Sequence, residues 1–216
     1  MSQPVIPDIT LDDGNTIPQL GFGVFRVPNE EATAAVAKAL DVGYRAIDTA
    51  AYYKNESGTG AAIAASGIPR EELHITTKVW HTDLGFESTM RAVKASLANL
   101  GVDYLDLYLI HWPVPARGLY IETWRAMEKI KSDGLARSIG VSNFPPDVLE
   151  RLLAETNTVP AVNQVELHPW LPQTAVREFD AGHGIATQAW SPLAHGQLVD
   201  DPTVAAVAQR HDKTPA

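Results

Sequence analysis

Four side chains of this 216-residue chain have the types needed for a proton transfer: Asp48, Tyr53, Lys78 and His111. A free tyrosine titrates at about 10, and a nearby ammonium group favours its phenolate form. Lys78 is the candidate for that ammonium group, and Asp48 is the partner that would limit the cost of burying it. A neutral His111, donating from one ring nitrogen, could hold a carbonyl oxygen beside the phenol.

A site of this kind protonates an oxyanion. It needs an external electron donor for a reduction, because no amino-acid side chain supplies a hydride. Each residue also has a structural interpretation when taken alone. Asp48 and Lys78 could be a structural ion pair, Tyr53 an ordinary loop residue, and His111 a hydrogen-bonded core residue. The argument for chemistry therefore depends on whether the elements of the fold bring the four together.

The elements that carry these residues follow a βα rhythm. Short apolar runs rich in β-branched and aromatic residues alternate with Ala-rich stretches at helical spacing, as in proteins with a parallel sheet. The predicted strands are 20–25, 45–49, 73–79, 104–111, 136–141, 161–166 and 185–190. The predicted helices are 30–42, 55–66, 86–100, 120–133, 146–156, 172–182 and 201–211.

Seven units of about 31 residues are close to the repeat of a (β/α)₈ TIM barrel, so the predicted fold class is α/β. Glycines follow five of the predicted helices, where a left-handed residue closes a helix: Gly43, Gly67, Gly101, Gly134 and Gly184. Residues 9–18 predict an N-terminal β-hairpin that turns on Asp13-Gly14 and closes one end of the barrel.

The predicted barrel is one unit short. The sequence reaches Ala216 soon after the seventh predicted helix, so we expect a single barrel domain, 1–216, that is truncated and lacks the eighth βα unit. In such barrels catalytic residues lie at the C-terminal ends of the strands. Asp48, Lys78 and His111 occupy such ends, and the alternation of strand residues turns all three toward the barrel axis.

Composition excludes several classes of protein. With 17 basic and 26 acidic residues the net charge is −9, which disfavours nucleic-acid binding. The absence of cysteine excludes disulfides, a thiol nucleophile and a thiolate metal site. Residues 1–20 lack the features of a signal peptide, and no run of apolar residues is long enough to span a bilayer. We therefore expect a cytoplasmic protein without a membrane segment.

Six motifs carry a resemblance to a known family. They are DTAAYYKNE at 48–56, TKVW at 77–80, DYLDLYLIHWP at 103–113, GVSNF at 140–144, NQVELHP at 163–169 and WSPL at 190–193. In type and order they closely resemble the aldo-keto reductases, and among these the bacterial 2,5-diketo-D-gluconate reductases. The resemblance implies an NADP-dependent oxidoreductase on a (β/α)₈ barrel, without a Rossmann glycine motif.

The resemblance implies reduction of small aldehydes, ketones or dicarbonyls to alcohols by hydride transfer from NADPH. Tyr53 would be the general acid, Lys78 and Asp48 its tuning pair, and His111 the donor that orients the carbonyl. Ser142, Asn143 and Gln164 would bind the nicotinamide carboxamide, and Trp190 would stack on the ring. The full set of implied cofactor contacts is Gly23, Val24, Asp48, Ser142, Asn143, Gln164, Trp190, Ser191, Leu193 and Gly196, and the implied substrate pocket is Phe25, Trp80 and Trp112.

Two departures from the family pattern affect these expectations. Phe25 stands where many relatives carry Trp, which removes an indole N–H from the pocket. The family binds the adenosine 2′-phosphate with basic residues after its eighth strand, so the preference for NADPH over NADH is implied by the family alone. The same resemblance implies a monomer whose partner is a small carbonyl compound, with no metal site.

Two other functions fit parts of the pattern. A non-catalytic, nicotinamide-binding regulatory subunit would keep the fold, as do the aldo-keto reductase-like β subunits of potassium channels, and would consume no NADPH. A metal-dependent hydrolase could use Asp48, His111, Glu166 and His168. It would lack a His-x-His pair on the first strand, and the Lys78 cation would oppose a metal ion.

Overall fold

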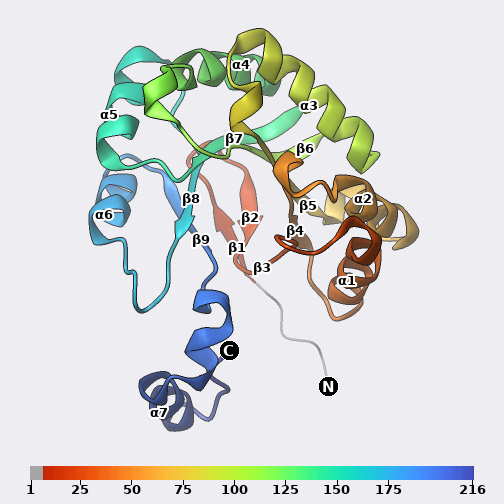
Figure 1. Ribbon diagram of the computed structural model, residues 1–216, viewed down its shortest axis with the longest axis vertical. Coiled ribbons are helices and arrows are strands. Elements are labelled where there is room, and N and C mark those ends of the chain that lie inside the picture. Colours follow the sequence, from red (N-terminus) through yellow and green to blue (C-terminus); the bar gives the residue numbers. More distant parts are fainter. Residues whose placement is uncertain (1–6) are drawn as a thin grey trace.

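Seven parallel strands form one sheet in the computed structural model, which describes residues 7–216 (Figure 1). They are β3 (Gly21–Gly23), β4 (Ala46–Asp48), β5 (His74–Val79), β6 (Leu105–Ile110), β7 (Ala136–Ser142), β8 (Val162–Glu166) and β9 (Ala186–Trp190). Each strand pairs with its neighbours in the sequence, in the order of a singly wound barrel. All seven predicted strands are confirmed, with their ends shifted by at most two residues.

Helices connect consecutive strands along the outside of the sheet. They are α1 (Asn29–Asp41), α2 (Glu56–Ala65), α3 (Phe86–Leu100), α4 (Tyr120–Ser132), α5 (Pro146–Glu155) and α6 (Thr174–Gly182). A seventh helix, α7 (Pro202–Arg210), follows β9. Figure 1 shows α1 to α6 as an incomplete ring and α7 set apart from it. Within 7–216, β3 and β9 are the two edges of the sheet and do not pair with each other. The predicted fold class, a (β/α)₈ barrel represented by seven of its βα units, is confirmed.

Alternation along the strands separates two apolar layers. Leu107 and Leu109 of β6 lie inside the sheet in a small cluster with Val162. Tyr108 and Ile110, between them in sequence, belong to the larger cluster packed against the helices. On β5, the Thr77 hydroxyl donates to Glu56 of α2 over 2.7 Å, which turns the next residue, Lys78, to the inner face. The predicted orientation of the strand-end residues follows from this alternation.

A hairpin covers the N-terminal end of the strands. It consists of β1 (Asp8–Thr10) and β2 (Thr16–Pro18), which pair antiparallel. Leu11 and Ile17 pack into the inner cluster, and Asn15 donates to the Ser138 hydroxyl near the start of β7 over 3.1 Å. The hairpin was predicted to close one end of the barrel, and its contacts place it at the end opposite Asp48, Lys78 and His111.

Candidate active site

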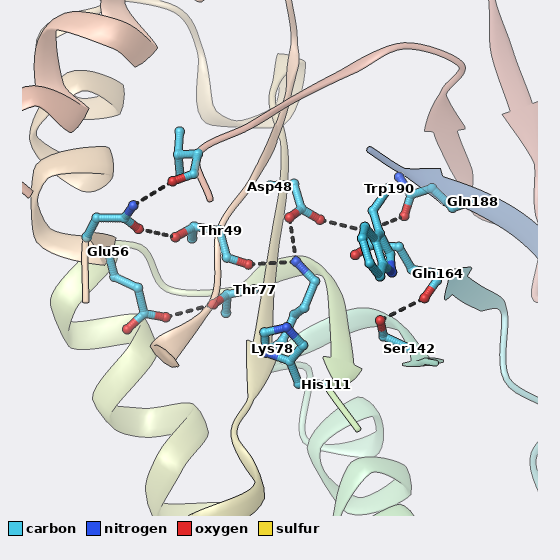
Figure 2. Close-up of polar contacts among 12 residues, drawn as sticks. Asp48, Thr49, Glu56, Thr77, Lys78, His111, Ser142, Gln164, Gln188 and Trp190 are labelled. Carbon is cyan, nitrogen blue, oxygen red and sulfur yellow. Dashed lines mark hydrogen bonds and ion pairs between the residues drawn. The ribbon is translucent and has the colours of Figure 1, made fainter. Parts of the chain in front are cut away.

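A buried ion pair joins the ends of β4 and β5. Lys78 is 1 % exposed, its ammonium group bonds the Asp48 carboxylate, and it donates to the Thr49 carbonyl over 3.0 Å (Figure 2). Burial alone would lower the pKa of Lys78, but Asp48, and then Tyr53, favour the charged form and raise that pKa overall. Lys78 is therefore a permanent cation at the inner face of the sheet.

Tyr53 reaches this cation from the short helix η1 (Ala51–Tyr53), which follows β4. The next residue, Lys54, has a left-handed conformation and ends the turn. The Lys78 ammonium nitrogen lies 5.3 Å from the centre of the Tyr53 ring, and the His111 ring lies 5.6 Å from it, nearly perpendicular. All four residues predicted for proton transfer thus lie together.

The net effect on the Tyr53 phenol differs from the sequence-based expectation. Burial raises the pKa of Tyr53; the Lys78 charge lowers it, and the Asp48 charge raises it again. The pKa is therefore above its ordinary value, whereas the proximity of Lys78 had predicted a phenol made more acidic. Desolvation of a phenolate exceeds the attraction of an ammonium group that already has a carboxylate partner. Tyr53 keeps its proton at neutral pH, as a proton donor must.

His111 follows β6 and is held neutral. Burial, then the Lys78 charge and then His81, lower the pKa of His111 to about 3. Its side chain is largely buried, and its Nδ1 atom has no hydrogen-bond partner among the described residues. Because Nδ1 is buried, Nε2 is the ring nitrogen that can meet a ligand, and in a neutral imidazole it can donate or accept there without first breaking an internal bond.

Hydrogen bonds tie the predicted carboxamide-binding residues to this group. Gln164 of β8 donates from Nε2 to Asp48 and to Gln188 of β9, over 2.8 Å each (Figure 2). Both amide hydrogens are used, so the carbonyl oxygen is the atom that Gln164 has left for a ligand. The Ser142 hydroxyl donates to the backbone carbonyl of Gln164 over 2.7 Å.

Asn143 links the next strand end to the aromatic residue predicted to stack on the nicotinamide. Its Nδ2 donates to the His111 carbonyl and to the Ser142 hydroxyl, over 3.0 Å each. Its Oδ1 accepts a hydrogen bond of 3.0 Å from the Trp190 indole. Asn143 has a positive φ of 62°, a conformation that asparagine tolerates better than most residues. Polar side chains thus converge at the ends of β7, β8 and β9, and the side-chain oxygen of Gln164 is the acceptor among them that is left for a carboxamide.

The remaining predicted cofactor residues divide into two groups. Gly23 pairs with Asp48 in register, and the amide of Val24 donates to the Asp48 carbonyl over 3.0 Å, which places both beside the ion pair. Ser191, Leu193 and Gly196 lie past the end of β9, in a segment with several left-handed residues. No side-chain hydrogen bond or ion pair within 7–216 joins these three to the ion pair of Lys78 and Asp48, so their role stays a prediction.

An apolar cavity of about 480 Å³ lies beside the site. Trp80 and Trp112, predicted for the substrate pocket, line it together with His81, Pro113, Val114, Pro115, Asn143 and Pro145. Phe25, the third predicted residue, packs against Tyr53 instead, with ring centres 5.0 Å apart. Tyr52 stacks on Trp80 at 3.9 Å, and the His111 ring lies 5.0 Å from the Trp80 ring, nearly perpendicular, so Trp80 contacts the imidazole and lines the cavity as well.

Residues that the sequence analysis missed support the site from behind. Gln188 fixes the Gln164 amide, and four of the cavity residues lie outside every motif: His81, Val114, Pro115 and Pro145. Asn55 and Thr49 lie inside the DTAAYYKNE motif, but nothing in their types distinguished them from ordinary loop residues. An Asn at the start of a predicted helix indicates a cap for that helix. The position of Asn55 therefore suggested a helix cap and gave no sign of its contacts with the carbonyl groups of Val24 and Val27.

The structure does not assemble the residues of the hydrolase alternative. Glu166 and His168 pair with each other over 3.2 Å, while Asp48 is engaged by Lys78 and Gln164. Residues 7–216 contain no cluster of three or more His, Asp or Glu side chains placed to hold a metal ion. In the same part of the chain, every helix is too short or too polar to cross a bilayer.

Comparison with known proteins assigns the family. The profile of the aldo/keto reductase family matches residues 19–215. The chain belongs to this family. As a member it is an NAD(P)-dependent oxidoreductase. An aldo-keto reductase of Mycolicibacterium smegmatis is 55% identical over 210 residues, covering 97% of this chain and 76% of the relative.

Solved structures of family members have the same fold. An aldo/keto reductase from Brucella melitensis is 52% identical with a TM-score of 0.94, covering 98% of this chain and 81% of the other. A variant of Gox0644 solved in complex with NADPH is 43% identical with a TM-score of 0.93, covering 98% and 77%. The matches establish the family for this reductase and do not single out the 2,5-diketo-D-gluconate reductase branch.

Proposed function

We propose that this aldo/keto reductase reduces small aldehydes, ketones and dicarbonyls to alcohols, with NADPH as the reductant and Tyr53 as the general acid. The observation that carries the proposal is the joint placement of a protonated phenol, a buried ammonium group and a neutral imidazole at neighbouring strand ends. The 2,5-diketo-D-gluconate reductase branch, the preference for NADPH over NADH and the monomeric state stay predictions.

The residues present fit a reduced nicotinamide. Gln164 presents a free side-chain carbonyl oxygen, which would accept from the amide of a carboxamide. Ser142 and Asn143, whose hydrogens are engaged within the site, would donate to the carboxamide oxygen by exchanging one of these bonds. Trp190 is held by its indole N–H, which leaves a fixed aromatic face for ring stacking. The bound cofactor would supply a hydride from C4 of its ring to the carbonyl carbon.

The four strand-end residues would manage the charge that forms on the substrate oxygen. His111, neutral because of burial, donates to the carbonyl oxygen and orients it. Tyr53 then transfers its hydroxyl proton to that oxygen, which completes the alcohol. Lys78 stabilises the resulting phenolate, and Asp48 holds Lys78 in place. The apolar cavity beside Trp80 would accept the rest of the substrate and exclude water.

The variant Tyr53→Phe tests the acid. The change removes one oxygen, so NADPH affinity, measured by quenching of tryptophan fluorescence, should stay the same. The rate of NADPH oxidation at saturating methylglyoxal should fall by about 10³-fold, within the usual range for general acids. A variant that retains most of its kcat contradicts the assignment of Tyr53.

The wild-type protein in the same assay tests the regulatory-subunit alternative. NADPH binding without measurable oxidation by any of a panel of aldehydes, ketones and dicarbonyls would favour a regulatory subunit over a reductase. Turnover of the panel, with a lower kcat/KM when NADH replaces NADPH, supports the reductase and its cofactor preference together.

A further inference from the structure

Asn55 stands at the start of α2 but does not cap that helix. No side-chain hydrogen bond from Asn55 reaches the first turn of α2. Asn29 of α1 caps the helix instead: its Oδ1 accepts from the Gly58 amide and from the Ser57 hydroxyl, over 2.9 Å each. A side chain at Gly58 would place its Cβ 2.4 Å from the Asn29 carbonyl, so glycine allows this approach. The side chain of Asn55 is thereby released for other contacts.

Those contacts are made to a turn that carries a predicted pocket residue. The Asn55 side chain, in a fully buried residue, donates from Nδ2 to the carbonyl oxygens of Val24 and Val27, over 2.9 Å each. Its Oδ1 accepts from the Thr49 hydroxyl over 2.7 Å. The two carbonyl groups belong to the first and last residues of the turn 24–27, which we call the Phe25 turn. Asn55 therefore binds both ends of this turn.

The Phe25 turn needs outside support. It is closed by a hydrogen bond of 3.1 Å from the Val27 amide to the Val24 carbonyl. Arg26, at its third position, has a φ of 65°, in the left-handed region that favours glycine. A turn with a strained non-glycine residue is held by contacts elsewhere in the fold. The two bonds from Asn55 are contacts of this kind.

The geometry of the turn decides where Phe25 lies. Phe25 is 49% exposed, and its ring centre is 5.0 Å from that of Tyr53. The same ring lies under the Arg26 guanidinium at 5.3 Å. An aromatic side chain that is half exposed and in contact with the proposed acid can pack against a substituent of the substrate. A methyl substituent offers little surface for that contact, whereas a phenyl group offers much more.

We propose that Asn55 is a positioning residue which, by holding the Phe25 turn, sets the preference of the enzyme for aromatic over small aliphatic carbonyl substrates. It acts through Phe25 and touches no reacting atom. This inference rests on the proposed reductase function. A purely structural Asn55 would affect all substrates to the same extent, whereas a positioning residue changes their ratio.

The test compares phenylglyoxal with methylglyoxal, which share a dicarbonyl and differ in the substituent. Asn55→Asp keeps the size of the side chain but turns an oxygen toward the carbonyl oxygens of Val24 and Val27. The ratio of kcat/KM, phenylglyoxal over methylglyoxal, should fall about tenfold, mainly through a higher KM for phenylglyoxal, which corresponds to about 1.4 kcal/mol. The kcat with methylglyoxal should stay within about threefold of wild type. Equal losses for both substrates would overturn the proposal.

Two further variants make the test independent of how well Asn55→Asp folds. Phe25→Ala alone should lower the same ratio, and Asn55→Asp should add nothing in that background. Arg26→Gly relieves the strain of the positive φ at position 26, so the turn depends less on Asn55. Added to Asn55→Asp, it should bring the kcat/KM ratio part of the way back to the wild-type value. An unchanged ratio in Phe25→Ala overturns the proposal even if Asn55→Asp does not fold. Failure of the wild-type protein to oxidise NADPH with either dicarbonyl would instead contradict the proposed function.

Discussion

Each end of the sheet combines a basic residue, an aspartate and a tyrosine, but the two groups differ in what they leave free for a ligand. At the N-terminal end, Asp106 bonds Arg70 at 2.7 Å and Arg137 at 3.4 Å, and it accepts from the Ile75 amide over 2.8 Å. The centre of the Tyr104 ring is 4.1 Å from the central carbon of the Arg70 guanidinium and 4.3 Å from that of Arg137. At the C-terminal end, Lys78, Asp48 and Tyr53 also combine a cation, a carboxylate and a phenol.

The difference lies in what remains for a ligand. The Tyr104 hydroxyl accepts from Arg137 over 2.9 Å, and two guanidinium groups lie against its ring. Tyr53 has the Lys78 cation near it, an aromatic neighbour at 5.0 Å, and a neutral imidazole with its ring centre at 5.6 Å. A buried ion pair beside a tyrosine is therefore not itself a sign of catalysis. The apolar cavity and the neutral imidazole distinguish the C-terminal end.

Removal of the cation at the C-terminal end should give the largest effect on activity. Lys78→Met keeps the length of the side chain and deletes its charge, so the phenolate left by proton transfer loses its stabilising neighbour. We expect kcat for methylglyoxal to fall by about 10³-fold, measured per folded molecule in single-turnover reactions with bound NADPH. A variant that keeps more than about a tenth of the wild-type rate would show that Tyr53 needs no cation.

The matched change at the N-terminal end should affect stability alone. Asp106→Asn leaves Arg70 and Arg137 without their carboxylate, and because both guanidinium groups are partly exposed to water we expect a cost of about 1.5–3 kcal/mol. The free energy of unfolding in urea should fall accordingly, while kcat per folded molecule changes by less than about twofold. A loss of kcat as large as in Lys78→Met would remove the functional distinction between the two ends.

The pH dependence of stability should reveal the neutral state of His111. The folded protein holds the pKa of His111 at about 3, because burial and then Lys78 and His81 disfavour its charge. In the unfolded chain the pKa is about 6.5, so between these values the unfolded state binds a proton that the folded state does not. Stability is therefore lost as the pH falls through this window, by up to about 1.4 kcal/mol per pH unit.

The variant His111→Gln isolates this contribution. Between pH 7.5 and 5.0 the wild-type protein should lose about 2 kcal/mol more free energy of unfolding than the variant, as measured by urea titration. His74, whose pKa is also lowered by burial, contributes equally to both proteins and cancels. Parallel pH profiles of the two proteins would mean that His111 is charged in the folded state at pH 5.0.

Much of the fold could be predicted because its signals are local. Strand positions follow from apolar runs between Ala-rich segments, and the glycines after the helices mark their ends. Gly43, Gly67, Gly101, Gly134 and Gly184 all have the positive φ that this placement implies. The convergence of Asp48, Lys78 and His111 follows from strand parity and from the common direction of parallel strands.

The rest of the site depends on balances that a sequence does not display. The direction of the pKa shift of Tyr53 is set by desolvation against the Lys78 charge, and this needs the burial of the finished fold. Asn55 has the residue type and position of a helix cap, and only the approach of Asn29 to Gly58 reveals another role. Gln188 has no motif of its own, and its contact with Gln164 comes from the β8–β9 register.

Loss of the Gln188 side chain should give the smallest effect of the changes at the C-terminal end of the sheet. At the C-terminal end the polar chain runs from Lys78 through Asp48 and Gln164 to Gln188, at the edge strand β9. Gln188→Leu leaves one amide hydrogen of Gln164 without its acceptor and loosens the carbonyl oxygen that would face the carboxamide. A neutral hydrogen bond is worth about 0.5–1.5 kcal/mol, so the Kd for NADPH should rise about threefold, with kcat at saturating cofactor unchanged. Ala189→Val, on the opposite face of the same strand, is the control and should leave the Kd at the wild-type value. An equal rise in both variants would mean that the edge strand, and not the Gln164 amide, governs cofactor affinity.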